Sequence, residues 1–226
     1  PYPIFSSDYA FMGTKDKTDK ITLYVVKESK SKSIFSTVAP RKGASETDIA
    51  IKFMLDCVAE LGFAHHTIHL KNDQEPALQA VIQGVIQGRA APTLLEESPV
   101  GSSQSNGSVE NAVSLTERGV RKLRTALENR YKFQIPLEHD IIPWLVLHSG
   151  FTYNRFQVGS DGKTAYSRVR GKLYDKALCE FGECVHYRIP KRLIGPELNK
   201  WDNRWGEGIF LGVRVTSSEL YIGTSE

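Results

Sequence analysis

Three carboxylates in distant parts of the chain, Asp8, Asp73 and Glu110, are the residues whose positions suggest chemistry. Asp8 lies inside segment 4–11, whose loose alternation predicts a strand, although aspartate is depleted in strands. Asp73 follows the short apolar segment 67–70, and Glu110 follows a stretch rich in serine and glycine. The simpler interpretation of Asp8 is a local turn bond at a strand end.

Carboxylates that converge repel one another, so a purely structural cluster of them would be costly. A divalent cation removes that cost, and hard oxygen ligands suit magnesium or manganese. Two such ions about 4 Å apart stabilise the attacking and leaving oxygens of an in-line displacement at phosphorus. This chemistry does not select the acids by itself, because others are available: Asp16, Asp19, Asp56, Glu75, Glu96 and Glu97.

The elements that must position these acids follow from the apolar pattern. Strands are predicted over 4–11, 21–26 and 33–38, joined by polar turns, which favours an antiparallel meander. Further along, apolar stripes at helical spacing alternate with short apolar runs. The predicted helices cover 49–61, the segment from Pro76 to just before Gly88, about 106–130, 141–153 and 164–169, and the predicted strands cover 67–70 and 93–96.

This order predicts an α/β domain over residues 1–172, with a mixed sheet and helices on its faces. Ligand sites in such sheets gather beyond the strand ends, so the three acids are expected to converge. From residue 173 the sequence pattern changes, and short glycine-rich strands are predicted at 181–188, 204–213 and 219–223. These predict a small β-barrel module over 173–226. Its tryptophans are expected to pack inside, with stacking on a nucleic-acid base as the alternative.

Composition narrows the class of protein. The 226 residues carry a net charge of +3, which alone does not imply a nucleic-acid partner. No apolar run approaches the roughly 18 residues of a membrane span, so no membrane partner is expected. Cys179, Cys184 and His186 could be zinc ligands, but reduced thiols in an intracellular protein are the favoured interpretation. The chain starts and stops abruptly, so we expect it to be a piece of a longer protein.

A family resemblance selects among the acids. Asp8 in a first strand, Leu70-Lys-Asn-Asp73-Gln-Glu75, and Gln104-Ser-Asn-Gly-Ser-Val-Glu110 resemble the catalytic core of retroviral and LTR-retrotransposon integrases. These enzymes form the DDE branch of the ribonuclease H-like superfamily. The stretch 98–110 resembles the retrotransposon motif almost position by position, and segments 181–183 and 205–212 resemble the β module that follows such cores. The resemblance implies a ribonuclease H-like mixed five-stranded sheet flanked by helices, followed by a small C-terminal β-barrel.

The resemblance also implies an activity. Asp8 would bridge two Mg²⁺ or Mn²⁺ ions, with Asp73 holding one and Glu110 the other. The enzyme would trim DNA ends and join them to target DNA, acting as a homo-oligomer in the nucleus of a host cell. Gln74-Glu75 departs from the Asn-Gly common in retroviral enzymes, and Glu75 is expected on the first helical turn instead of at the metals.

Basic and polar residues that could contact DNA fall into three groups, on the loop before Glu110, on the long helix after it, and towards the C-terminus. They are Gln104, Ser105, Asn106, Arg118, Arg121, Lys122, Arg124, Arg168, Lys191, Arg192 and Arg204. The alternative for the helix is a solvated face with ion pairs to Glu117 and Glu128. Two alternative functions stay open: a related metal nuclease that cuts without joining, and an inactive nucleic-acid-binding remnant.

Overall fold

The structure is a computed structural model, which describes residues 2–13, 20–43, 49–97, 103–190, 201, 203–215 and 217–225, apart from the side chains of 97 and 103–106. The chain divides into two compact units, Pro1–Asp175 and Lys176–Glu226. Each unit has a sheet of its own. The first unit carries all three candidate acids.

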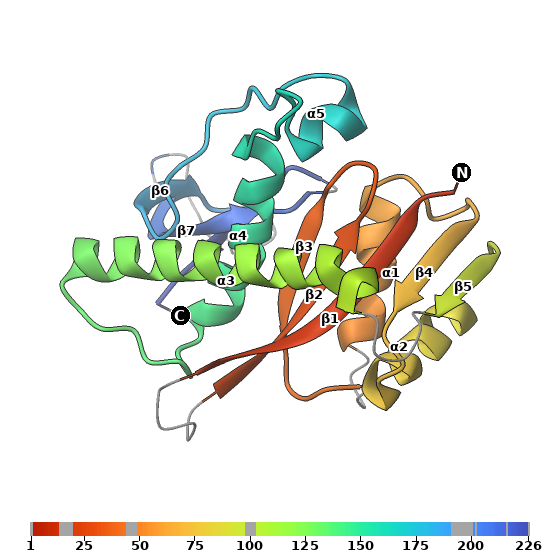
Figure 1. Cartoon of the computed structure of the whole chain (residues 1–226). Coiled ribbons are helices and arrows are strands. Elements are labelled where there is room, and N and C mark those ends of the chain that lie inside the picture. The colour runs from red at the N-terminus through yellow and green to blue at the C-terminus, as the bar shows by residue number, and fades with distance from the viewer. Residues whose placement is uncertain are drawn as a thin grey trace. The chain divides into compact units, whose positions relative to one another are not determined.

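A mixed five-stranded sheet with strand order β3-β2-β1-β4-β5 forms the centre of the first unit (Figure 1). The strands are β1 (Ile4–Gly13), β2 (Lys20–Glu28), β3 (Ile34–Ala39), β4 (Ile68–Asn72) and β5 (Thr93–Glu97). The first three pair antiparallel, whereas β4 pairs parallel with both β1 and β5. The predicted meander, followed by strand–helix units, is confirmed.

One face of this sheet carries the main hydrophobic core. Alternation along β1 points Phe5 and Tyr9 to that face, where they pack with Tyr24 of β2. The helices α1 (Ile49–Glu60) and α2 (Pro76–Gln87) cover it with their apolar stripes. Pro76 opens α2 as predicted, because its missing N–H would have no partner in a first turn.

The opposite face of the sheet lies under α3 (Ser103–Tyr131) and α4 (Ile141–Phe156), and the short helix α5 (Ala165–Arg170) follows (Figure 1). Val109, Ala112 and Val120 of α3 are buried. The Lys27 ammonium of β2 donates to the Ser108 carbonyl at 3.2 Å, which fixes the early turns of α3 on the sheet.

The start of α3 differs from the sequence prediction. The helix begins at Ser103, so residues 103–105, predicted to precede it, have helical backbone. Serine, asparagine and glycine are weak helix formers and favour turns, which is why their pattern indicated a loop. The described contacts that hold α3 on the sheet begin just after these residues, at Ser108 and the buried Val109.

The second unit contains a three-stranded antiparallel sheet with the order β6-β7-β8. Its strands are β6 (Cys184–Arg188), β7 (Trp205–Val213) and β8 (Leu220–Gly223). Phe181, Phe210 and Leu211 are buried. The predicted C-terminal β module is therefore present, and its described strands form a small sheet. Among the described residues, no helix is long and apolar enough to cross a membrane.

Candidate active site

The register of β1 and β4 brings Asp8 and Asp73 together. Ile4 pairs with His69 and Phe5 with Leu70 in the parallel ladder. Carried on by three residues, the same register places Asp8 beside Asp73. Beyond the last ladder pair, the Asn72 side chain links the strands at the position that this register predicts: the Ser7 N–H donates to Asn72 Oδ1 at 2.8 Å, and Asn72 Nδ2 donates to Ser7 Oγ at 2.9 Å.

Asp8 faces the side of the sheet that α3 covers, since its neighbours Ser7 and Tyr9 face the other core. Partial burial raises the pKa of the Asp8 carboxyl, and the charges of Glu75 and Asp73 raise it further. The Tyr9 N–H, which donates to Asp8 Oδ1 at 2.7 Å, and the Lys42 charge oppose that rise in the pKa. The local bond suggested by the simpler interpretation of Asp8 is thus present, but inside a strand and beside other acids.

Glu75 lies closer to this chemistry than the sequence suggested. It is the N-cap residue of α2 and makes no side-chain capping bond. Its Oε1 instead accepts from Lys42 Nζ at 2.7 Å, and its charge acts on Asp8 more strongly than that of Asp73. Lys42 also lies 5.2 Å from the Phe11 ring centre and 5.8 Å from that of Tyr9. The Lys42–Glu75 ion pair therefore lies at the edge of the Asp8–Asp73 site.

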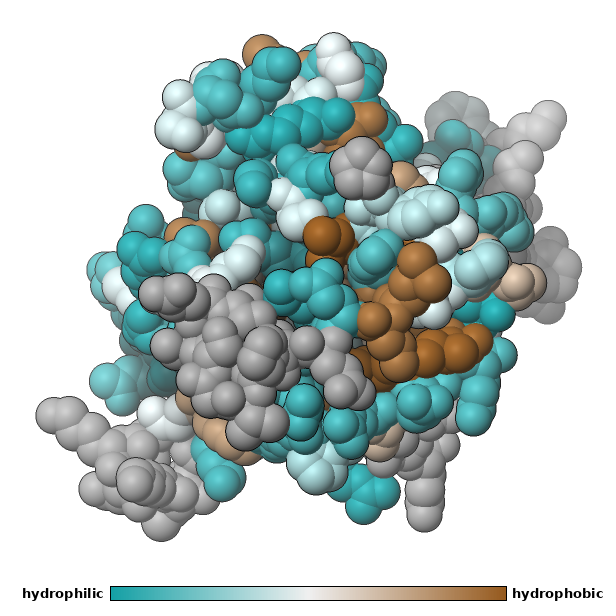
Figure 2. Space-filling view, turned by 45° about the vertical axis from the view of Figure 1, so that its right-hand side comes forward, coloured by the Kyte–Doolittle hydropathy of each residue, from teal (hydrophilic) through white to brown (hydrophobic). Residues whose placement is uncertain are grey.

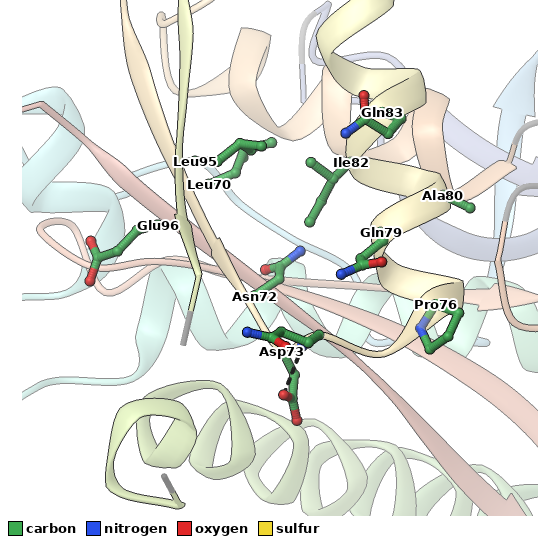
Figure 3. A pocket seen from close by; sticks show the side chains of 11 residues that line it. Leu70, Asn72, Asp73, Pro76, Gln79, Ala80, Ile82, Gln83, Leu95 and Glu96 are labelled. Atoms are coloured by element: carbon green, nitrogen blue, oxygen red, sulfur yellow. Dashed lines mark hydrogen bonds between the residues drawn. The ribbon is translucent and has the colours of Figure 1, made fainter. Parts of the chain in front are cut away.

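Asp73 is exposed, and its Oδ1 accepts from the Gln74 N–H at 2.8 Å. In Figure 3 its carboxylate points out of the neighbouring pocket, on the side where α3 is drawn. Glu110 is exposed on α3. Within the described ranges, no group of three or more His, Cys, Asp or Glu side chains is placed to hold a metal ion. The structure thus brings Asp8 and Asp73 together and leaves Glu110 outside a completed ligand group.

A pocket of about 410 Å³ adjoins Asp73, between β4, β5 and α2. Leu70, Ile82 and Leu95 supply its apolar side chains, and amide groups surround them (Figure 3). Leu94 and Leu95 of the edge strand β5 are 43% and 47% exposed. Figure 2 shows apolar side chains gathered on one part of the surface. The site therefore offers an apolar, amide-lined surface next to a carboxylate.

The predicted DNA-contact residues differ in the contacts that they make within the protein. Arg121 pairs with Glu117 at 3.4 Å, and Arg124 pairs with Glu128 at 2.9 Å, as the alternative of a solvated face predicted. Arg168 donates to Asp161 from Nε at 3.1 Å and to the Ser31 carbonyl at 3.2 Å. Arg118, Lys122 and Arg168 line one groove between α3, α4 and the loop that leads to α5.

Of the remaining predicted DNA-contact residues, the structure describes the side chain of Arg204 only. Arg204 precedes β7 in the second unit and is half-buried, and its carbonyl accepts from the Ile189 N–H at 2.9 Å. The side chains of Gln104, Ser105 and Asn106 lie outside the described residues, as do Lys191 and Arg192. No contact with DNA is assigned to any of them here. No disulfide bond joins Cys57, Cys179 and Cys184, which agrees with the expectation of reduced thiols.

Sequence reasoning missed Lys42, Ser7 and Asn72. Lys42 follows the β3 strand in a basic, proline-containing break, where lysine is an ordinary solvated residue. Ser7 and Asn72 each precede a candidate acid and hold the two strands in register through their side chains. Their position immediately before the acids was the available signal, but it became meaningful only once the β1–β4 pairing was known.

Comparison with known proteins bears on the fold. No family model matches the chain, and no curated protein matches it. The magnesium complex of the HTLV-2 integrase catalytic core in its trimeric form is similar over 74% of this chain and 95% of that one, with 17% identity and a TM-score of 0.54. The dimeric form gives 74% and 94% coverage, 18% identity and a TM-score of 0.51.

A third similar structure spans more of the chain. In the simian T-cell lymphotropic virus intasome in complex with the PP2A regulatory subunit B56 gamma, the match covers 97% of this chain and 74% of that one. Its identity is 18% and its TM-score is 0.58. At these identities the likeness concerns the fold, and it agrees with the strand order and flanking helices described above. The chain has the fold of a retroviral integrase catalytic core.

Proposed function

We propose that this protein is a metal-dependent polynucleotidyl transferase that trims DNA ends and joins them to target DNA. The observation that carries the proposal is the side-by-side placement of Asp8 and Asp73 by the β1–β4 register, within an integrase-core fold. The structural similarity by itself supports the coarser function of a polynucleotidyl transferase. Trimming and joining are the finer part of the proposal, which the motif resemblance supports.

The donor chemistry at the site fits a divalent cation. Asp8 has a raised pKa, because its partly buried charge is costly and two carboxylates act on it. A cation held by Asp8 and Asp73 would remove that cost, and carboxylate oxygens are what magnesium prefers. Bound there, such ions would supply Lewis-acid stabilisation for displacement at phosphorus. Glu110 is the third proposed ligand, and reaching the other two requires a rearrangement of its side chain or of the first α3 turns.

The chain's own groups prepare the two acids. The Tyr9 N–H orients the Asp8 carboxylate, and the Gln74 N–H orients that of Asp73. Lys42 neutralises Glu75, whose charge would otherwise oppose ionisation of Asp8 still more. These contacts hold Asp8 and Asp73 with oxygens directed by the backbone, which is the preorganisation that a metal site requires.

The similar structures support the proposed cofactor and partners in general terms. Two of them are magnesium complexes, in trimeric and dimeric forms, and one is an intasome. We accordingly propose Mg²⁺ or Mn²⁺ as cofactor, DNA as substrate and self-association of this chain. Action on DNA within a host nucleus completes the proposal.

A strand-transfer assay with labelled DNA ends and added Mg²⁺ or Mn²⁺ tests the function. The wild-type protein should cut and join, and Asp73→Asn should do neither, while both bind DNA equally in the presence of a chelator. Hydrolysis without joining would favour the related nuclease. Equal product from Asp73→Asn and the wild type would overturn the assignment of the acids, and binding without any reaction under all metal conditions would favour an inactive remnant.

A further inference from the structure

A wide basic groove lies on the α3 side of the first unit, apart from the acids. It has a volume of about 1110 Å³ and runs between α3, α4, the loop that leads to α5, and the β2–β3 turn. Its single acidic side chain among the described residues is Asp161. Its cationic side chains are Lys27, Lys30, Lys32, Arg118, Lys122, Lys163 and Arg168.

Some of these cations support the groove, and others are presented to a ligand. Arg168 is held by both oxygens of Asp161 and by the Ser31 carbonyl. Lys27 is buried and donates to the Ser108 carbonyl. By contrast, the exposed Lys32, Lys122 and Lys163 form no ion pair within the part of the chain that the structure describes. The groove therefore keeps a net positive charge after its internal pairs are counted.

The helical period of α3 relates this groove to the acids. Asn111, Leu115, Arg118 and Lys122 follow one another at four, three and four residues, so they share one flank of the helix. Glu110 lies on the opposite flank with Glu117 and Arg121, on the other side of the buried stripe. Asn111 nevertheless adjoins Glu110 directly, so α3 forms the boundary between the acids and the groove.

The pairing of β1 and β2 also relates the groove to the proposed active site. Asp8 pairs with Val25, and Lys27 lies two residues further along β2 on the same face. Lys27 is also part of the groove lining. The inner end of the groove therefore begins near the proposed active site and leads away from it.

The lining indicates the class of ligand. Besides the cations it offers hydroxyl and amide groups from Ser149, Thr152, Tyr153, Gln157 and Ser160. Lysine, arginine and hydroxyl side chains are the groups that contact phosphates and sugars in protein–DNA complexes, and they do so without reading sequence. A row of separated cations matches a row of phosphates.

We propose that this basic groove binds the phosphate backbone of DNA, away from the reacting phosphate, as a sequence-independent tract that positions the substrate. The choice of DNA rests on the proposed function. The contact is electrostatic, so it contributes affinity and salt dependence and takes no part in the chemistry.

Binding of a fluorescent DNA duplex, measured by anisotropy in a chelator at several salt concentrations, tests the proposal. The double variant Lys122→Ala/Lys163→Ala should bind roughly three- to tenfold more weakly, and the slope of log K against log salt should become shallower by about 2. Lys122→Arg/Lys163→Arg should retain wild-type affinity because it keeps the charges. Lys52→Ala, at an exposed lysine of α1 on the opposite face of the sheet, is the matched control.

The outcomes separate this proposal from the catalytic one. Equal affinity and salt slope for the alanine double variant and for Lys52→Ala overturn the groove proposal and leave the acid site untouched. A change in oligomeric state in sedimentation, with DNA affinity unchanged, also overturns it, because the groove would then hold an acidic segment of a second copy. If Asp73→Asn loses catalysis yet shows the predicted groove dependence of binding, the groove proposal is supported independently of the reaction.

Discussion

At the scale of single residues, the carboxyl group of Asp8 is governed by opposing influences. Burial raises its pKa, the Glu75 and Asp73 charges add to the rise, and the Tyr9 N–H and Lys42 oppose it. A carboxyl in this position gains most from a nearby cation, since the cation offsets both burial and repulsion. The strand register thus creates a site whose electrostatics favour cation binding.

The first residue-scale prediction concerns Lys42. Because its charge lowers the pKa of Asp8, Lys42→Ala should raise that pKa and move the acidic limb of the activity–pH profile to higher pH. Glu75→Gln should move the same limb to lower pH, because it removes a charge that raises the pKa. NMR titration of the Asp8 side-chain carboxyl, without metal, measures the shift directly. Lys52→Ala is the control, and a shift in the same direction for both Lys42→Ala and Glu75→Gln would contradict the assignment.

The second prediction at the residue scale concerns Glu110. Glu110→Gln keeps the shape of an exposed side chain and removes one proposed metal ligand, so the fold should survive. Strand-transfer activity should fall by more than about a hundredfold, since even loss of an outer-shell contact typically costs 10- to 100-fold. Glu117→Gln, about two turns further along the same flank of the helix, should retain activity. Retained activity in Glu110→Gln would remove Glu110 from the site.

The three acids were selectable from sequence because a motif surrounds two of them, but their supporting residues were not. Lys42 acts through space on a residue more than thirty positions away. The influence of Glu75 on Asp8 likewise depends on where α2 begins relative to β1, which no spacing rule contains. Sequence reasoning therefore reached the proposed ligands and missed the charges that tune them.

At the scale of elements, α3 is the part where prediction and structure differ most. Its amphipathic stripe correctly predicted a long helix, whereas its start was placed about one turn late. Local propensity opposes a helix over residues 103–105, and the described contacts that hold α3 on the sheet begin only at Ser108 and Val109. A helix end that forms against local propensity is also an end whose opening costs little free energy. This is the segment that must adjust if Glu110 is to join Asp8 and Asp73.

Two glycines of α3 test that view. A Cβ at Gly107 would meet nothing within 4 Å, whereas one at Gly119 would lie 2.2 Å from Ser149 Oγ. Gly107→Ala should therefore stabilise the protein by about 0.5–1 kcal/mol in urea unfolding. Gly119→Ala should gain less, because the Ser149 hydroxyl must rotate away from the new methyl group. If the first turns must rearrange for catalysis, Gly107→Ala should also be slower in strand transfer despite its greater stability. An unchanged rate would show that α3 acts as it stands.

The contact of α1 with α4 and α5 should make stability depend on pH. Burial raises the pKa of Glu60 to about 7, against the opposing charges of Arg155 and Arg170. Arg155 lies 3.7 Å from the Phe151 ring centre, and Arg170 donates to the Glu60 carbonyl at 3.3 Å. Between the ordinary pKa of glutamate and about 7, only the folded state keeps the proton, so the free energy of unfolding falls as pH rises through that window.

Denaturant unfolding between pH 5 and 8 measures this effect. The wild type should lose on the order of 1 kcal/mol or more relative to Glu60→Gln over the window. His148, whose lowered pKa of about 4 makes stability rise with pH up to its ordinary value, acts equally in both proteins and cancels in that difference. Glu138→Gln, at an exposed glutamate, should follow the wild type. A Glu60→Gln profile as steep as that of the wild type would place the pH dependence elsewhere.

At the scale of the whole molecule, the order of strands and helices was predictable because each element carries its own period and its own turn residues. The residues that form the interior of the second unit were harder to predict from the sequence. Trp201 and Trp205 were predicted to pack inside it, yet they are 99% and 56% exposed. The described core there consists of Phe181, Phe210 and Leu211. Aromatic residues in short glycine-rich strands suit either face, and the alternation alone does not decide which face is buried.

The division into two units gives the last prediction. All residues of the main core, from Phe5 to Val85, and all three candidate acids belong to Pro1–Asp175. A protein ending at Asp175 should therefore unfold in one cooperative transition and should still be stabilised by Mg²⁺ or Mn²⁺, with Asp8→Asn abolishing the stabilisation.

The DNA affinity of this shortened protein should be lower than that of the full chain, because exposed Trp201 and Trp205 and the cation Arg204 are removed. Stacking of a base on an aromatic ring contributes about 1–3 kcal/mol. Trp205→Ala in the full chain separates stacking from the loss of the unit as a whole. A truncated protein without a cooperative transition would mean that the first unit depends on the second for its stability.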